Sequence, residues 1–156
     1  MRVPMSIVLI ALTIIPAAAE ETLFAEPAPG QLNNVETHSL GDIMMLKQLR
    51  HIKLWYAGRS RNWALVNFEL RQIEKALADA AMRYQNIPTD YIVAGGKPLH
   101  MMEEAARAQD QKKFVQGFDD LTAACNSCHQ AGQVGFIKIR QPTSSPFSNQ
   151  IFEPAR

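Results

Sequence analysis

The chain has 156 residues, of which 47% are hydrophobic and 20% charged, and its formal net charge is +1. This length suits a single domain, and the apolar content is sufficient for a core. Because the charge is nearly balanced and no run of like charge occurs, we exclude a nucleic acid or an anionic membrane surface as the partner.

Residues 1–19 have the features of a secretory signal peptide. Arg2 supplies the positive end, residues 7–15 form a short apolar run, and Ala17-Ala18-Ala19 precede Glu20 as a small-residue cleavage site. The run is too short for a permanent membrane span, so an uncleaved anchor is the weaker alternative. Cleavage would leave 137 residues, with 15 basic and 15 acidic side chains, because Arg2 is the only charge removed.

Residues 20–38 contain Pro27, Pro29 and Gly30 and lack helical periodicity, so we predict an extended leader. A helical domain is predicted over residues 39–132. Its first helix spans residues 37–58, with Ser39 or Thr37 as the cap. Its apolar residues form two stripes, which fit two neighbours in a bundle or a homodimer interface. The stripes are Leu40, Ile43, Met44, His51, Leu54 and Trp55, and then Met45, Leu49, Ile52 and Tyr56.

The second helix is predicted over residues 62–85, with Asn62 as its cap. A linker over residues 85–96 follows, with room for one short turn at residues 89–93, and Pro98 is predicted to begin the third helix, which runs to about Ala108. One apolar stripe on the second helix has helical spacing. It consists of Trp63, Val66, Leu70, Ile73, Leu77, Ala81 and Tyr84.

The fourth helix is predicted over residues 110–132, with Asp110 as its cap. Its apolar positions recur at spacings of four and three, and the two cysteines of the chain continue the stripe. The stripe consists of Phe114, Phe118, Leu121, Cys125 and Cys128.

Cys125-Asn126-Ser127-Cys128-His129 has the CxxCH spacing of a c-type haem attachment site. Thiols three residues apart lie on one side of a helix, so both can bond to the vinyl groups at one porphyrin edge, and the next imidazole can bind the iron. A disulfide or redox dithiol and half of a zinc site are the alternatives. There is no second CxxC and no HxxxH in the chain.

Residues 133–156 form a tail in which Pro142 and Pro146 rule out a long helix. We predict that this extended tail packs back on the domain through its spaced apolar residues. These are Phe136, Ile137, Ile139, Phe147, Ile151 and Phe152.

Four predicted helices with CxxCH near the end of the last resemble the class II cytochromes c, the four-helix-bundle group that includes cytochromes c′. The likeness covers about residues 39–132. The chain is more similar still to uncharacterised bacterial monohaem cytochromes, although its tail is longer than that of typical cytochromes c′. The similar segments are Leu40-Gly41-Asp42-Ile43-Met44, His51-Ile52-Lys53-Leu54-Trp55, Asn62-Trp63, Cys125 to His129, Gly135-Phe136-Ile137, Pro142-Thr143 and Pro146-Phe147-Ser148-Asn149-Gln150.

The resemblance implies an all-α antiparallel four-helix bundle with one haem c on its last helix, attached in the periplasm. Cys125 and Cys128 would hold the haem, and His129 would be the proximal iron ligand. In the bundle cytochromes the early part of the first helix lies opposite that histidine, which makes Met44 the expected sixth ligand. His51 is the rival, about 10 Å further along the same helix. Met45 is a weaker candidate, and an open sixth site is the third possibility.

We expect a periplasmic one-electron carrier that exchanges electrons with redox partner proteins. A gas-binding or sensing haem protein is the alternative, and a small dithiol protein is the third. No nucleophile with a partnered base, helix-supported carboxylate pair or glycine-rich phosphate loop is evident, so no enzyme is expected.

Overall fold

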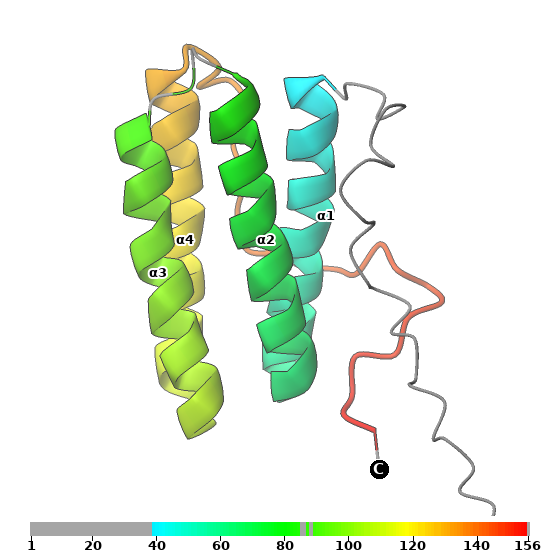
Figure 1. Cartoon of the computed structure of the whole chain (residues 1–156). Coiled ribbons are helices and arrows are strands. Elements are labelled where there is room, and N and C mark those ends of the chain that lie inside the picture. The colour runs from blue at the N-terminus through cyan, green and yellow to red at the C-terminus, as the bar shows by residue number, and fades with distance from the viewer. Residues whose placement is uncertain (1–38, 85–86, 88, 156) are drawn as a thin grey trace, which may run out of the picture. The chain divides into compact units, whose positions relative to one another are not determined.

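The computed structural model describes residues 39–84, 87 and 89–155, and over these residues the fold is all-α, with four helices and no strand. The chain runs up and down through the bundle, so consecutive helices are antiparallel (Figure 1). The predicted signal peptide and leader, residues 1–38, lie outside the described residues. None of the described helices combines the length and apolar character that crossing a bilayer requires. The helices are α1 (Leu40–Arg59), α2 (Trp63–Arg83), α3 (Thr89–Ala108) and α4 (Gln111–Ala131).

The N-terminal caps predicted for the first, second and fourth helices are confirmed. Ser39 forms a capping box with Asp42: its hydroxyl accepts from the Asp42 amide at 3.2 Å, and its own amide donates to the Asp42 carboxylate at 3.0 Å. Asn62 accepts from the Leu65 amide at 3.1 Å. Asp110 accepts from two amides in the first turn of α4, each at 3.0 Å. These side chains satisfy amides that have no partner within the helix.

The predicted start of the third helix at Pro98 is wrong, because α3 begins nine residues earlier, at Thr89. Proline has no amide hydrogen and is costly inside a helix, so it is usually found at helix starts. Here Pro98 and Gly95 are both buried, and Ile92 packs against the core. Packing of this segment therefore offsets the local cost, and most of the predicted linker is helical.

The core contains the predicted stripes of α2 and α4. A chain of ring contacts runs through it, with centroids 4.3 Å apart for His51 and Phe118, 4.8 Å for Trp55 and Phe118, and 6.3 Å for Phe114 and Phe118. Such pairs each add about 0.5–1.5 kcal/mol beyond the burial of their area. The buried stripe residues are Val66, Leu70, Ile73 and Leu77 on α2, and Phe114, Phe118, Leu121 and Cys125 on α4.

The second apolar stripe predicted for α1 is only partly covered. Met45 is 56% exposed and Leu49 38%, so the first half of this stripe is not covered by a second helix of the bundle, and the homodimer interface stays a prediction for it. Further along, the Tyr56 ring contacts Phe152 of the C-terminal segment at a centroid distance of 5.4 Å. A segment without regular structure therefore takes the place of the expected helix.

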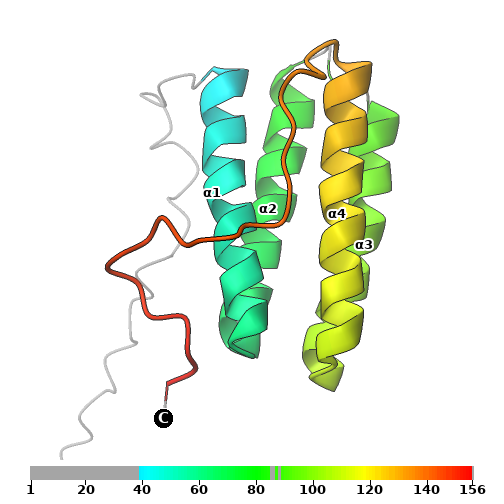
Figure 2. The ribbon, with the colours of Figure 1, turned by 180° about the vertical axis from the view of Figure 1, so that it is seen from behind.

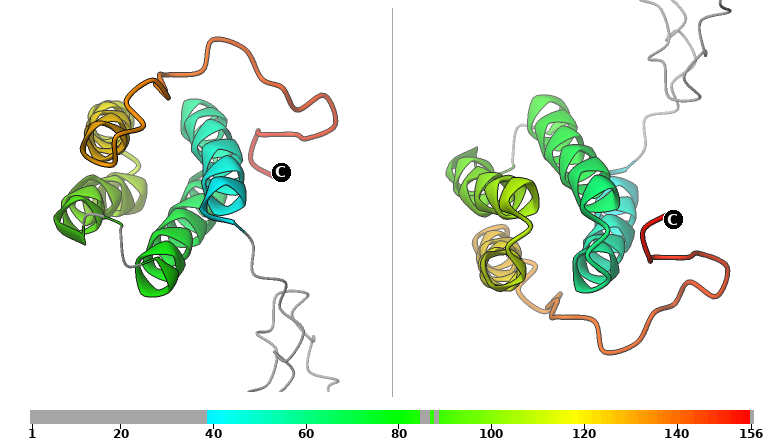
Figure 3. Two further views of the ribbon diagram at one scale, coloured as in Figure 1. Left: turned by 90° about the horizontal axis from the view of Figure 1, so that it is seen from above. Right: turned by 90° about the horizontal axis from the view of Figure 1, so that it is seen from below.

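The first and last helices form the loosest side of the bundle. Contacts are extensive between α1 and α2, α2 and α3, and α3 and α4, and sparse between α1 and α4. Views along the bundle show α1 and α4 standing apart (Figure 3). We call this α1/α4 boundary the seam.

Residues 133–155, here called the C-terminal strap, contain no helix or strand and run from α4 towards α1 (Figure 2). Near α4, Gln141 donates to the Asp119 carboxylate at 2.7 Å. Near α1, the Lys53 ammonium lies 4.9 Å from the centre of the Phe147 ring. Two apolar strap residues expected to pack on the domain, Phe136 and Ile151, are instead more than 80% exposed, at 83% and 81%.

Candidate functional site

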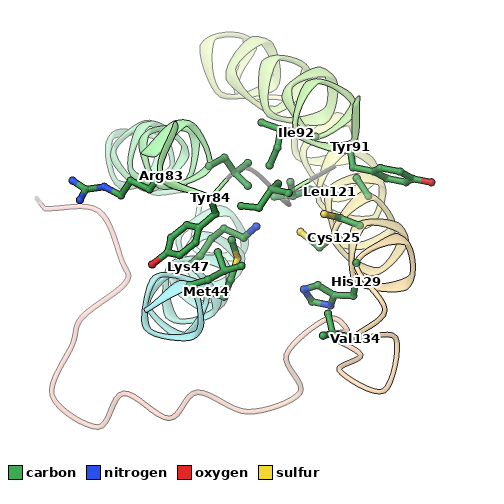
Figure 4. A pocket seen from close by; sticks show the side chains of 17 residues that line it. Met44, Lys47, Arg83, Tyr84, Tyr91, Ile92, Leu121, Cys125, His129 and Val134 are labelled. Carbon is green, nitrogen blue, oxygen red and sulfur yellow. The ribbon is translucent and has the colours of Figure 1, made fainter. Parts of the chain in front are cut away.

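A cavity of about 440 Å³ lies at the end of the bundle where the CxxCH segment ends α4, and residues of all four helices line it. This volume is within the range of small-molecule and cofactor sites. Cys125, Cys128 and His129 line it from α4, and Met44 lines it from α1, on the opposite wall (Figure 4). The structure therefore brings together all four residues singled out from the sequence.

A second cavity of about 350 Å³ adjoins the first. It extends along α1 to His51 and reaches the strap residues Ile137 and Ile139. Seven residues line both spaces, so the two cavities are neighbouring parts of one hollow region that reaches the seam. They are Leu40, Met44, Lys47, Leu121, Cys125, His129 and Val134.

The two thiols are free and occupy the same side of α4, as their spacing requires. Cys125 is buried and Cys128 half-buried. Burial raises the pKa of the Cys125 thiol, and the nearby Lys47 ammonium opposes this only in part. A thiol held in its neutral form lacks the low pKa that marks redox-active dithiols, so this environment does not favour dithiol exchange.

His129 has a defined orientation. Its Nδ1 lies 2.8 Å from the carbonyl oxygen of Ile137 in the strap. A carbonyl oxygen can only accept, so Nδ1 carries the proton in this hydrogen bond, and the lone pair of the neutral ring is on Nε2. Histidines that bind metals usually donate their other ring N–H to such an acceptor, which fixes the tautomer and the orientation of the ring.

His51 is arranged differently. Its Nε2 lies 2.9 Å from the Thr122 hydroxyl, which itself donates to the Phe118 carbonyl at 2.8 Å. Because that hydroxyl proton is already used, His51 Nε2 must donate. Burial, followed by repulsion from Lys47, lowers the His51 pKa to about 4. His51 lines the second cavity but not the first.

Neither cavity is lined by Arg50, Lys53, Arg61 or Arg140. Arg50 instead pairs with the buried Glu69 at 3.2 Å. The cations that do line the first cavity are Lys47 and Arg83. The position of Lys47, three residues after Met44 on a helix, is the sequence signal that could have identified it.

The residues present fit a haem c group. They provide two free thiols at the required spacing, an imidazole with its Nε2 lone pair available, a thioether on the opposite wall, and the Lys47 ammonium, which points into the cavity whereas Arg83 points away from it (Figure 4). The remaining lining is largely apolar, as expected for a buried porphyrin. It includes Leu40, Leu77, Ile87, Ile92, Leu121 and Val134.

Within the part of the chain that the structure describes, no cluster of three or more His, Cys, Asp or Glu side chains could hold a metal ion. The chain matches no known protein-family model. Comparisons with curated proteins and with solved structures likewise found no match.

Proposed function

We propose that the protein is an exported, periplasmic monohaem cytochrome c that carries single electrons between redox partner proteins. The supporting observation is that Cys125, Cys128, His129 and Met44 share one cavity, with His129 Nδ1 hydrogen-bonded to a carbonyl. The CxxCH spacing is the most specific sign of haem in the sequence, and the cavity supports it because it offers space beside this segment and has Met44 on its opposite wall.

Each residue has a role in this proposal. Cys125 and Cys128 would hold the group through thioether bonds, and His129 Nε2 and the Met44 sulfur would bind its iron. Haem c, when bound, supplies a one-electron iron couple, and histidine–methionine ligation raises its reduction potential. One electron enters from a donor protein and one leaves to an acceptor, with no atom transferred.

The hydrogen bonds favour Met44 over His51 as the sixth ligand. His51 Nε2 is used in the bond to Thr122, and its ring stacks on Phe118 in the core. Binding iron through that nitrogen would leave the Thr122 hydroxyl without its donor. No hydrogen bond of this kind holds Met44 among the described residues, and Met44 lines both cavities.

A second candidate function is binding of a small gas at an open sixth site. The observation that favours it is the 350 Å³ cavity next to Met44, which could accept a diatomic molecule if the thioether did not bind iron. In the four-helix-bundle cytochromes that this chain resembles, the two functions differ in whether a protein side chain binds the iron at the sixth position or leaves that position open.

The test is expression in a host that matures c-type cytochromes, followed by mass spectrometry and absorption spectra in both oxidation states. We expect the added mass of one haem, its loss in a Cys125→Ser, Cys128→Ser double variant, and a low-spin spectrum. A colourless protein without added mass would contradict the proposal and favour the dithiol alternative. High-spin ferrous protein that binds carbon monoxide readily would favour the gas-binding function.

Met44→Ala tests the sixth ligand. It should convert the low-spin spectrum to high-spin and allow carbon monoxide to bind, because the thioether is removed. Met82→Ala is the matched control, since Met82 is 76% exposed on α2 and lines neither cavity. An unchanged spectrum in Met44→Ala would show that Met44 is not the ligand.

A further inference from the structure

Asn126, the first residue between the two cysteines, makes a paired contact with the strap. Its side-chain Nδ2 donates to the Ile139 carbonyl at 2.9 Å, and its Oδ1 accepts from the Ile139 amide at 2.9 Å. The amide group of asparagine offers a donor and an acceptor side by side, so it can satisfy both backbone groups of one residue. We call this pair of hydrogen bonds the Asn126 clamp.

Ile139, which the clamp holds, lies two residues after Ile137, whose carbonyl accepts the hydrogen bond from His129 Nδ1. The strap turns back after α4: the Val134 amide donates to the His129 carbonyl at 2.9 Å, and the Ile137 amide donates to the Val134 carbonyl at 2.8 Å. The Ile137 carbonyl then accepts from His129 Nδ1 at 2.8 Å. The backbone that holds the imidazole is therefore fixed by the turn on one side and by Asn126 on the other.

We infer that Asn126 is a positioning residue for the His129 ligand. It acts by clamping the strap so that the Ile137 carbonyl stays on Nδ1. This inference rests on the proposed function, because it concerns His129 as an iron ligand.

Besides the turn at residues 134–137, side-chain burial adds little to the position of Ile137. Its side chain is 48% exposed, and the preceding Phe136 is 83% exposed, so burial contributes little to the position of this part of the strap. Ile139, which the clamp holds, packs against the core. Loss of the clamp should therefore free the Ile137 carbonyl from Nδ1.

The hydrogen bond to Nδ1 has a measurable effect on an iron ligand. Donation from Nδ1 to a carbonyl makes the imidazole more basic, which stabilises the oxidised iron more than the reduced iron. Partners of this kind typically change metal-site properties by about tenfold or more. Loss of the clamp should therefore shift the equilibrium between oxidised and reduced iron about tenfold towards the reduced form. For a one-electron couple this raises the reduction potential by about 59 mV.

The test is the reduction potential of Asn126→Leu, which removes both hydrogen bonds while keeping a side chain of similar size. Ile139→Pro removes one of the two hydrogen bonds of the clamp, the one from the Ile139 amide, and it should also raise the potential. Hydrogen exchange of residues 134–141 is followed in the same samples and should accelerate in both variants.

Two controls separate this role from general loosening. Ser127→Ala changes the exposed neighbour within the same motif and should leave the potential unchanged. Gln141→Ala removes a strap contact beyond the clamp, the 2.7 Å hydrogen bond to Asp119, and it should also leave the potential unchanged.

The outcomes are distinct. Faster strap exchange with an unchanged potential in Asn126→Leu and Ile139→Pro would overturn the inference, since Asn126 would then only tether the strap. A changed potential with unchanged strap exchange would also overturn it. A wild-type protein without haem would instead overturn the proposed function, and this inference with it.

Discussion

Protonation of His51 should destabilise the folded protein. The residue is 4% exposed, and burial and Lys47 lower its pKa from the ordinary value of 6.5 to about 4. The unfolded chain therefore binds a proton at this site below about pH 6.5, whereas the folded protein does so only near pH 4. Stability from this residue is complete above the unfolded pKa and is lost as the pH falls towards the folded one.

The size of the effect follows from the shift. The 2.5-unit difference, at 1.36 kcal/mol per unit, gives about 3 kcal/mol between pH 7.5 and pH 4. Burial raises the pKa of Glu69, so that carboxyl acts with the opposite sign: its contribution is lost as the pH rises through its folded pKa. A pH profile of the wild type alone mixes both effects.

The measurement is therefore a comparison of wild type with His51→Leu. Urea unfolding, followed by helical circular dichroism at pH 7.5 and pH 4, gives the free energy of unfolding of each protein. The difference between the two should shift by about 3 kcal/mol in favour of the variant at the lower pH. His100→Leu is the control, because the His100 side chain is 67% exposed. An equal difference at both pH values would refute the reasoning.

Gly58→Ala should destabilise the protein by about 1–3 kcal/mol, because a Cβ at this position would overlap the ring of the fully buried Phe114. Gly96→Ala, in open space on α3, should instead stabilise it by about 0.5–1 kcal/mol, and thermal unfolding that ranks the two in reverse would contradict the packing. Arg50→Met should cost about 1–3 kcal/mol at pH 7 because it leaves the Glu69 carboxylate buried without its partner. Adding Glu69→Leu should recover most of that loss in a double-mutant cycle, and strict additivity would show that the pair is not coupled.

The parts of the fold that depend on local chemistry could be predicted from the sequence. Ser39, Asn62 and Asp110 cap their helices because their side chains accept from amides two or three residues away. The α4 stripe was equally predictable, since a helical period alone brings Phe114 and Cys125 to the same face.

Features that depend on distant packing could not be predicted. Pro98 has the local character of a helix start, and only its burial, together with that of Gly95, shows why α3 continues through it. The exposure of Met45 has the same origin, because α1 and α4 contact each other too little to cover that side of α1.

The candidate site was partly predictable for the same reason. The CxxCH spacing identifies Cys125, Cys128 and His129, and the resemblance adds Met44, which lines the same cavity. The Asn126 clamp has no sequence signal, because its partner is a backbone group 13 residues away. Any residue except proline could supply both of those backbone groups, so composition does not identify the partner.

The seam also has a consequence for the order in which the chain is made. Its two walls are the first and last helices, so it cannot exist until α4 has been synthesised, and the strap that borders it comes later still. Cys125 and Cys128 are likewise made before any strap residue, because they precede it in the chain. If the chain holds haem as proposed above, the group could reach both thiols before the strap residues that line the second cavity have been made.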